Sequence, residues 1–171
     1  MIQKEELKLK EIKERFKLAE AYYKAALSMR NKKEYFRMAI DLAYNAAELI
    51  AKCFLLLKID DLPSRHGGII RKFSELYVKE EILSKALGKN FHHCFDLRNQ
   101  ARYVPKAKIV KADVELSLKL AQEMIKNLEI FLKISHSPLA KRASLASLAE
   151  SKRAESRRAC LALRVKAGQP R

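Results

Sequence analysis

The segment RMAIDLAYNAAELIAKCFLLL, residues 37–57, decides the fold of this chain. After Arg37, its only polar residues are Asp41, Asn45, Glu48 and Lys52, at spacings of four, three and four. Residues at these spacings share one face of an α-helix, so the rest of the helix surface is apolar. A helix that is apolar almost all round is packed on several sides. The segment therefore predicts a central helix, which we expect to cover residues 34–58.

The remainder of the chain up to residue 134 also has a helical pattern. There are only four glycines and four prolines, and no stretch alternates apolar and polar residues as a strand does. Apolar residues instead recur at steps of three and four in segments joined by short connections. This pattern predicts an all-α fold, an antiparallel up-and-down bundle of four to five helices. Besides the central helix, the expected helices cover residues 4–29, 69–78, 80–102 and 113–133.

Glycines, prolines and one aspartate set the expected helix ends. Pro63 and the pair at residues 67–68 separate the central helix from the third helix. The fourth helix is expected to weaken near Gly88 and to end before Pro105, which cannot continue it. Asp113 is the expected amino-terminal cap of the last helix.

Residues 135–171 differ in composition from the rest of the chain. They contain no aromatic residue, nine Lys or Arg and two acidic residues, and so hold nearly half of the net charge of +16. We expect a helical-bundle domain over residues 1–134 and a basic, disordered tail over residues 135–171. Three interpretations of the tail stay open: a solvated extension, an arm that binds nucleic acid, or sequence that is not native to the protein.

The composition also restricts partners and compartment. The net charge of +16 favours polyanionic partners such as nucleic acid. The three cysteines are widely separated, and His92, His93 and Cys94 point in different directions on a helix, so neither disulfides nor a metal site is indicated. The charged amino terminus is unlike a secretory signal, and the run CFLLL is far shorter than the roughly 20 residues of a membrane span. We expect a cytoplasmic protein without membrane contact, metal or other cofactor.

The segment CFDLRNQARYVP, residues 94–105, contains the first candidate functional residues. Arg98 falls in the middle of the apolar face of the fourth helix, with Arg102 close beside it. A buried arginine needs an anionic partner, because an unpaired buried charge is too costly to persist. The carboxylates of Asp41 and Glu48 on the central helix are possible internal partners, and they would make Arg98 a structural residue.

A bound phosphate is the other possible partner of these arginines. Pro105 ends the helix, so we expect the chain to turn and to bring Tyr103 back toward Arg98. Two guanidinium groups beside an aromatic ring can bind a phosphate and stack a base, as proteins that bind single-stranded nucleic acid do.

The order of these segments resembles the HEPN domain family, especially its small stand-alone prokaryotic members. The resemblance rests on AEAYYKAAL at residues 19–27, the central segment, RHGGIIRKF at 65–73 and LRNQARY at 97–103. It covers about residues 5–134 and none of the tail.

This resemblance implies a four- or five-helix bundle that commonly dimerises and places two copies of the arginine segment around a shared cleft. Family members are nucleotide-binding modules or metal-independent ribonucleases, often in toxin–antitoxin pairs with a minimal nucleotidyltransferase. The active ribonucleases carry an arginine followed, after four to six residues, by a histidine. Arg98 matches that arginine and Asn99 the polar residue that often follows. Tyr103 stands in place of the histidine, and Arg102 stands where the stand-alone members usually have an acid.

Three functions follow as hypotheses. The leading one is a homodimeric HEPN-like nucleotide- or RNA-binding protein, as part of a toxin–antitoxin type system with a nucleotidyltransferase. The alternative is a metal-independent endoribonuclease toxin that uses Arg98 with His66 or Tyr103 as the base, although His66 could equally cap or pack at the start of a helix. The third is an interaction protein whose arginines are structural. The expected phosphate-binding residues are Arg98, Arg102, Tyr103, Asn99, Lys52 and Glu48.

Overall fold

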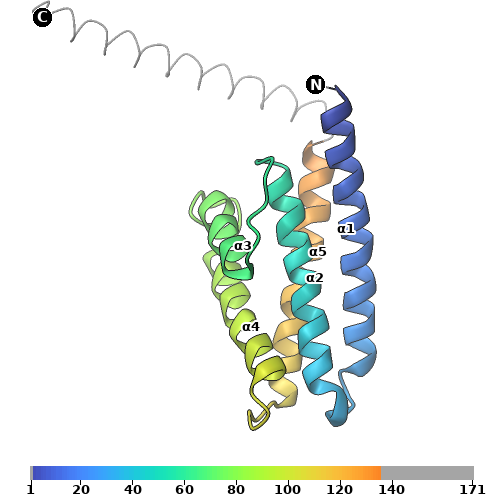
Figure 1. Ribbon diagram of the computed structural model, residues 1–171, viewed down its shortest axis with the longest axis vertical. Helices are drawn as coiled ribbons and strands as arrows, with labels where there is room; N and C mark the ends of the chain where they lie inside the picture. Colours follow the sequence, from blue (N-terminus) through green and yellow to red (C-terminus); the bar gives the residue numbers. More distant parts are fainter. Residues whose placement is uncertain (1, 136–171) are drawn as a thin grey trace, which may run out of the picture. The chain divides into compact units, whose positions relative to one another are not determined.

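The computed structural model describes residues 2–135, which form five α-helices and two shorter helical segments. The helices are α1 (Ile2–Met29), α2 (Phe36–Leu56), α3 (His66–Phe73), α4 (Lys85–Tyr103) and α5 (Lys111–Ser135), with the 3-10 helix η1 (Lys33–Tyr35) and the π-helix η2 (Ser74–Val78). Residues 2–128 form one compact unit in which the long helices alternate in direction along the chain (Figure 1). The predicted all-α bundle is therefore confirmed.

The central helix is α2, as its sequence predicts. α1 packs along one side of it, and α3 and α4 contact another (Figure 1). Of its 21 residues, 14 are buried, which explains why its sequence is apolar almost all round. Small side chains let the helices approach closely: Ala26 of α1 packs with Ala39 and Ala43 of α2 in one core cluster. Val114 and Leu118 of α5 complete that cluster.

The third and fourth helices begin at different residues than expected. α3 begins at His66 and includes Gly67 and Gly68, so the prediction that these glycines precede the helix is wrong. A Cβ atom on Gly68 would lie 2.9 Å from the Cβ of Pro63, so this glycine allows the preceding loop to pack on the first turn of α3. α3 ends at Phe73, five residues before the predicted end, and the π-helix η2 continues the helical segment to Val78. The remaining helix ends lie within two residues of the predicted ones, apart from the start of α4.

α4 begins at Lys85 and continues through Gly88, so the predicted weak point is also wrong. The chain first turns at Glu81, whose φ of 57° lies in the left-handed region. Ser84 then caps the helix, because its Oγ accepts a hydrogen bond from the Leu87 N–H at 3.1 Å. A Cβ atom on Gly88 would lie 3.0 Å from a methyl carbon of Val78, so this glycine serves close packing of η2 on α4.

Asp113 stabilises the start of α5 from within the helix and is not its cap. α5 begins at Lys111, and the Asp113 Oδ2 accepts a hydrogen bond from the backbone N–H of Val110 at 2.9 Å. This is the arrangement in which an acidic residue of the first turn reaches back to the residue before the helix. The predicted tail lies outside the described residues except for Ser135, the last residue of α5.

Arg37 fixes the segment that follows α4, although the sequence gives no sign of this role. Its guanidinium Nη1 donates to the carbonyls of Ala101 at 2.8 Å and Val104 at 3.0 Å. Its Nη2 donates to the carbonyls of Pro105 at 2.7 Å and Ala107 at 2.8 Å. One side chain at the start of α2 thus satisfies the last carbonyls of α4 and the loop beyond it, and a cation there also complements the helix dipole.

We predict that Arg37→Ala lowers the free energy of unfolding by about 1.5–3 kcal/mol, the contribution of hydrogen bonds to a charged group. Urea denaturation measures the change, with exposed Arg30→Ala as the charge-matched control. Arg37→Lys should lower the free energy of unfolding by an intermediate amount, because a single ammonium group cannot donate hydrogen bonds to all four carbonyls. Equal stability of the Arg37 and Arg30 variants would contradict this role.

None of the helices in residues 2–135 combines the length and the apolar character that crossing a membrane requires.

Candidate functional site

The two arginines of α4 share one carboxylate on α2. Arg98 Nε donates to Asp41 Oδ1 at 3.1 Å, and Arg102 Nη2 donates to Asp41 Oδ2 at 3.2 Å. Arg98 is 3% exposed, whereas the side chain of Arg102 is 44% exposed. Asn99 also contacts this group, because its Oδ1 accepts from Arg98 Nη1 at 3.1 Å. Of the two internal partners proposed for Arg98, the structure brings Asp41 to it, and the three charges leave one net positive charge.

Two tyrosine rings flank the buried guanidinium. The Arg98 Cζ atom lies 5.8 Å from the ring centroid of Tyr44 and 5.8 Å from that of Tyr103, within the range of cation–π attraction. Tyr103 is 65% exposed, so much of its ring surface faces solvent. The expected turn before Tyr103 does not occur: this residue ends α4, and its ring reaches Arg98 from within the helix.

A second polar cluster surrounds the buried carboxylate of Glu48, which is 4% exposed. Lys52 Nζ lies 2.7 Å from Glu48 Oε1, and the Tyr44 hydroxyl donates to Oε2 at 3.0 Å. The Nδ1 atom of His66, the first residue of α3, also contacts Oε2. Glu48 is therefore not the partner of Arg98 but the acceptor for three groups from α2 and α3.

The partners of Glu48 determine its protonation. Burial alone would raise the pKa of the Glu48 carboxyl, but hydrogen bonds from Lys52 and His66 and their charges outweigh burial and hold the pKa below the ordinary value of 4.5. Glu48 is thus ionised at neutral pH and can only accept hydrogen bonds. In a neutral His66 imidazole the hydrogen must then be on Nδ1, which leaves the Nε2 lone pair for other partners. The His66 side chain is 45% exposed, so this ring is open to solvent.

The lowered pKa of Glu48 predicts a loss of stability in acid. A carboxyl with a lowered folded-state pKa stabilises the fold at pH values above 4.5, and this contribution is lost as the pH falls through the folded-state pKa. Glu48→Gln should therefore be less stable than the native protein at pH 7, and the difference should shrink as the pH falls below 4.5. Urea denaturation across this range tests it, with exposed Glu14→Gln as the control. A difference that grows on acidification would contradict the assignment.

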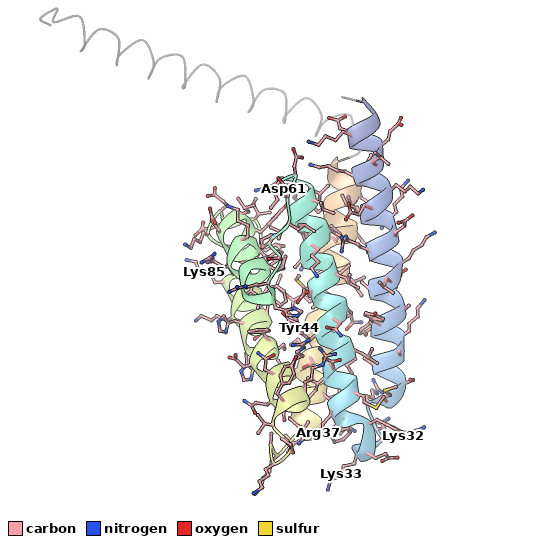
Figure 2. All side chains as sticks on the ribbon, in the orientation of Figure 1. Lys32, Lys33, Arg37, Tyr44, Asp61 and Lys85 are labelled. Carbon is pink, nitrogen blue, oxygen red and sulfur yellow. The ribbon has the colours of Figure 1, made fainter. Side chains whose placement is uncertain are left out.

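Tyr44 connects the two clusters. Figure 2 shows it midway along α2, on the side that faces α3 and α4. Its ring centroid is 6.4 Å from that of His66 and 5.7 Å from that of Phe95. Because Arg98 Cζ lies 5.8 Å from the same centroid, the His66 ring and the Arg98 guanidinium are at most about 12 Å apart. Burial and the neighbouring Glu48 raise the pKa of the Tyr44 phenol, so it stays a hydrogen-bond donor.

Sequence reasoning missed Tyr44 and the role of Arg37 in this region. Tyr44 precedes Glu48 by one helical turn, a spacing that could have indicated the hydrogen bond. His92 and His93 are exposed on α4, and His92 Nδ1 lies 3.5 Å from Asp96 Oδ2.

A shallow cavity of about 460 Å³ opens at the end of the bundle where α2 begins. Lys33, Glu34, Phe36, Arg37 and residues 107–110 line it, so neither Arg98 nor Glu48 takes part.

The sequence model of the HEPN domain family matches residues 12–134, which are more than half of the chain. The chain belongs to the HEPN domain family. No curated protein matches the sequence significantly. Both clusters of this HEPN domain lie inside the matched range, and the predicted membership of the HEPN family is confirmed.

Proposed function

We propose that this HEPN protein binds a nucleotide or a single-stranded RNA at Arg98, Arg102 and Tyr103. The observation that carries the proposal is the pair of guanidinium groups on Asp41, one buried and one half-exposed, beside the exposed ring of Tyr103. This arrangement has a net positive charge at the point where a phosphate could approach. It also has an aromatic surface on which a base could stack.

Each ligand contact has a separate physical reason. Arg102 keeps much of its guanidinium in solvent while one nitrogen holds Asp41, so it can donate further hydrogen bonds to a phosphate. Tyr103 can stack a base of any sequence, because every base has a π-face, and such stacking contributes about 1–3 kcal/mol per base. Asn99 steadies Arg98, while Glu48 and Lys52 neutralise each other nearby and are supporting residues in this proposal.

A second candidate function, a metal-independent endoribonuclease, is favoured by the contact between His66 and Glu48. Such cleavage needs a base for the 2′-hydroxyl proton and a cation for the developing phosphorane charge. Glu48 would orient His66 so that Nε2 accepts the proton, and Arg98 or Arg102 would stabilise the charge. Tyr103, whose exposed ring lies beside Arg98, is the alternative base.

The assembly and the cell compartment are further parts of the proposal. Family membership supports a homodimer and pairing with a nucleotidyltransferase in a toxin–antitoxin type system. Exposed apolar side chains near the arginines, Met38 and Val104 among them, are suited to burial against another chain. Cys53 and Cys94 are free thiols, as is usual for proteins of the reducing cytoplasm. Burial raises the pKa of the Cys53 thiol to about 12 and that of Cys94 to about 11, so both stay protonated at neutral pH.

One experiment separates the two candidate functions. The whole chain is incubated with labelled single-stranded RNA in EDTA, and both binding and cleavage are followed for the native protein, Arg98→Ala, His66→Ala and the control His92→Ala. Binding without cleavage, lost in Arg98→Ala alone, supports the binding protein. Cleavage to 2′,3′-cyclic phosphate ends, lost in both Arg98→Ala and His66→Ala, establishes the ribonuclease. Folded native protein that neither binds nor cleaves RNA and also fails to bind free nucleotides would contradict both functions.

A further inference from the structure

The end of the bundle where α2 begins has an excess of positive charge. Two segments meet there, residues 30–37 and residues 104–113, because Arg37 donates hydrogen bonds to carbonyls of the second segment and both segments line the cavity of about 460 Å³. Together they contain seven Lys or Arg and two acidic residues. None of these seven cations takes part in an ion pair within residues 2–135.

The opposite end of the bundle is different, because lysines there have a carboxylate partner. Lys4 and Lys8 of α1 both form ion pairs with Asp60 in the segment that follows α2. Figure 2 shows Asp61, the neighbour of Asp60, at that end, and Lys32, Lys33 and Arg37 at the other. The cations at the start of α2 are thus the ones that remain available to an anion from outside the chain.

The cavity at the start of α2 combines this charge with apolar surface. Its lining includes the side chains of Phe36, Ile109 and Val110 together with the cations Lys33, Arg37 and Lys108. Glu34 also lines it and offsets one of the three positive charges. Ligand pockets of about 300–1,000 Å³ are typically apolar with a few polar or charged groups that fix the orientation of the ligand. A nucleotide fits this description, because it joins a flat base to a negative phosphate.

Arg37 connects the cavity with the candidate site on α4. Its Nη1 donates to the carbonyl of Ala101, the residue before Arg102, and to that of Val104, the residue after Tyr103. The same side chain lines the cavity, and its carbonyl partners are neutral, so its charge is not neutralised. A strand with one nucleotide at Arg102 and Tyr103 can therefore continue to the cavity along a positively charged surface.

We propose that this cavity is a second nucleotide subsite for the same single-stranded RNA. A further nucleotide of the strand would place its phosphate on Lys33, Arg37 or Lys108 and its base against the apolar wall. The inference rests on the proposed function, because it extends the strand bound at Arg102 and Tyr103. Proteins that bind single strands commonly combine a basic groove along the backbone with surfaces on which successive bases lie.

The test is the salt dependence of the affinity of the whole chain for labelled hexauridylate. The proteins are the native chain, the double variant Lys33→Gln with Lys108→Gln, and the control double variant Lys10→Gln with Lys13→Gln. All four lysines are exposed and outside the ion pairs of residues 2–135, so both variants should fold. The control lysines lie in the first half of α1, which begins at the end of the bundle opposite the start of α2 (Figure 1).

The variants should differ in how steeply affinity falls with salt. Each phosphate contact of a single strand contributes about 0.7 to the slope of log affinity against log salt concentration, so the cavity variant should lose about 1.4 and the control variant nothing. Equal losses in the two variants would show that binding follows net charge alone, and this overturns the inference. An unchanged slope in the cavity variant also overturns it, while binding that still depends on Arg98 leaves the proposed function standing.

Photo-crosslinking of the native chain is the second measurement and needs no variant. A strand with 4-thiouridine at every position should crosslink to residues 33–36 or 107–110 in addition to residues 98–105. Crosslinks at residues 98–105 without any at the cavity overturn the inference alone. Absence of RNA binding by the native chain overturns both the inference and the proposed function.

Discussion

Arg98→Met is expected to reduce the affinity for single-stranded RNA by about ten- to one hundredfold, because it removes one of the two positive charges that share Asp41 and so the net positive charge of this group, and a charge-assisted interaction contributes about 1.5–3 kcal/mol. Arg98 is the buried member of the arginine pair and positions both Asp41 and the Tyr103 ring. Its removal therefore affects the phosphate contact and the stacking surface together. Fluorescence anisotropy of a labelled oligonucleotide with the whole chain measures the change.

The fold should tolerate this substitution. Methionine fills much of the same apolar space, and Asp41 keeps its contact with Arg102 in a partly exposed position, so no buried charge is left unpaired. Arg71→Met, on the exposed face of α3, removes the same charge elsewhere and serves as the control. Equal affinities of the two variants would show that binding follows net charge and does not depend on this site.

Tyr44→Ala is expected to lower the free energy of unfolding by about 3–5 kcal/mol, as the loss of a large buried aromatic ring does. Tyr44 is fully buried, and its ring contacts Phe91, Phe95 and His66. The substitution also removes the group that connects Arg98 to the Glu48 cluster. Urea denaturation measures the change.

Tyr44→Phe separates the contribution of the ring to stability from that of the hydroxyl group. It should cost only about 0.5–1.5 kcal/mol, since Glu48 Oε2 keeps His66 as a partner. Tyr35→Ala, at a position that is 39% exposed, is the control for loss of a tyrosine. A cost of Tyr44→Ala no greater than that of Tyr35→Ala would contradict the central position of this ring.

The sequence predicts those parts of the structure that depend on local pattern. The apolar surface of residues 37–57 predicts α2 and its central place, and the position of Arg98 on an apolar face predicts its burial. The helix start predicted after Gly68 and the weak point predicted at Gly88 are wrong, because these glycines permit close packing against Pro63 and Val78. Such tertiary contacts cannot be read from the local sequence pattern.

Individual residues of the site could be predicted from the sequence, but the contacts between residues on distant segments could not. His66 and Glu48 were both candidates, but their contact depends on how the loop after α2 places the start of α3. Arg37 binds carbonyls more than 60 residues away in the sequence, and its own helix gives no sign of them. Such contacts follow from tertiary packing and not from helical periodicity.

The central claim is that RNA lies against the exposed Arg102 and Tyr103, beside the buried Arg98. The most direct measurement is photo-crosslinking of 4-thiouridine-labelled single-stranded RNA to the whole chain, with the crosslinked residue identified by mass spectrometry. We predict a crosslink on Tyr103 or its neighbours in residues 98–105, which disappears in Arg98→Met and persists in Arg71→Met. Crosslinks confined to other parts of the chain, and unchanged in Arg98→Met, would contradict the claim.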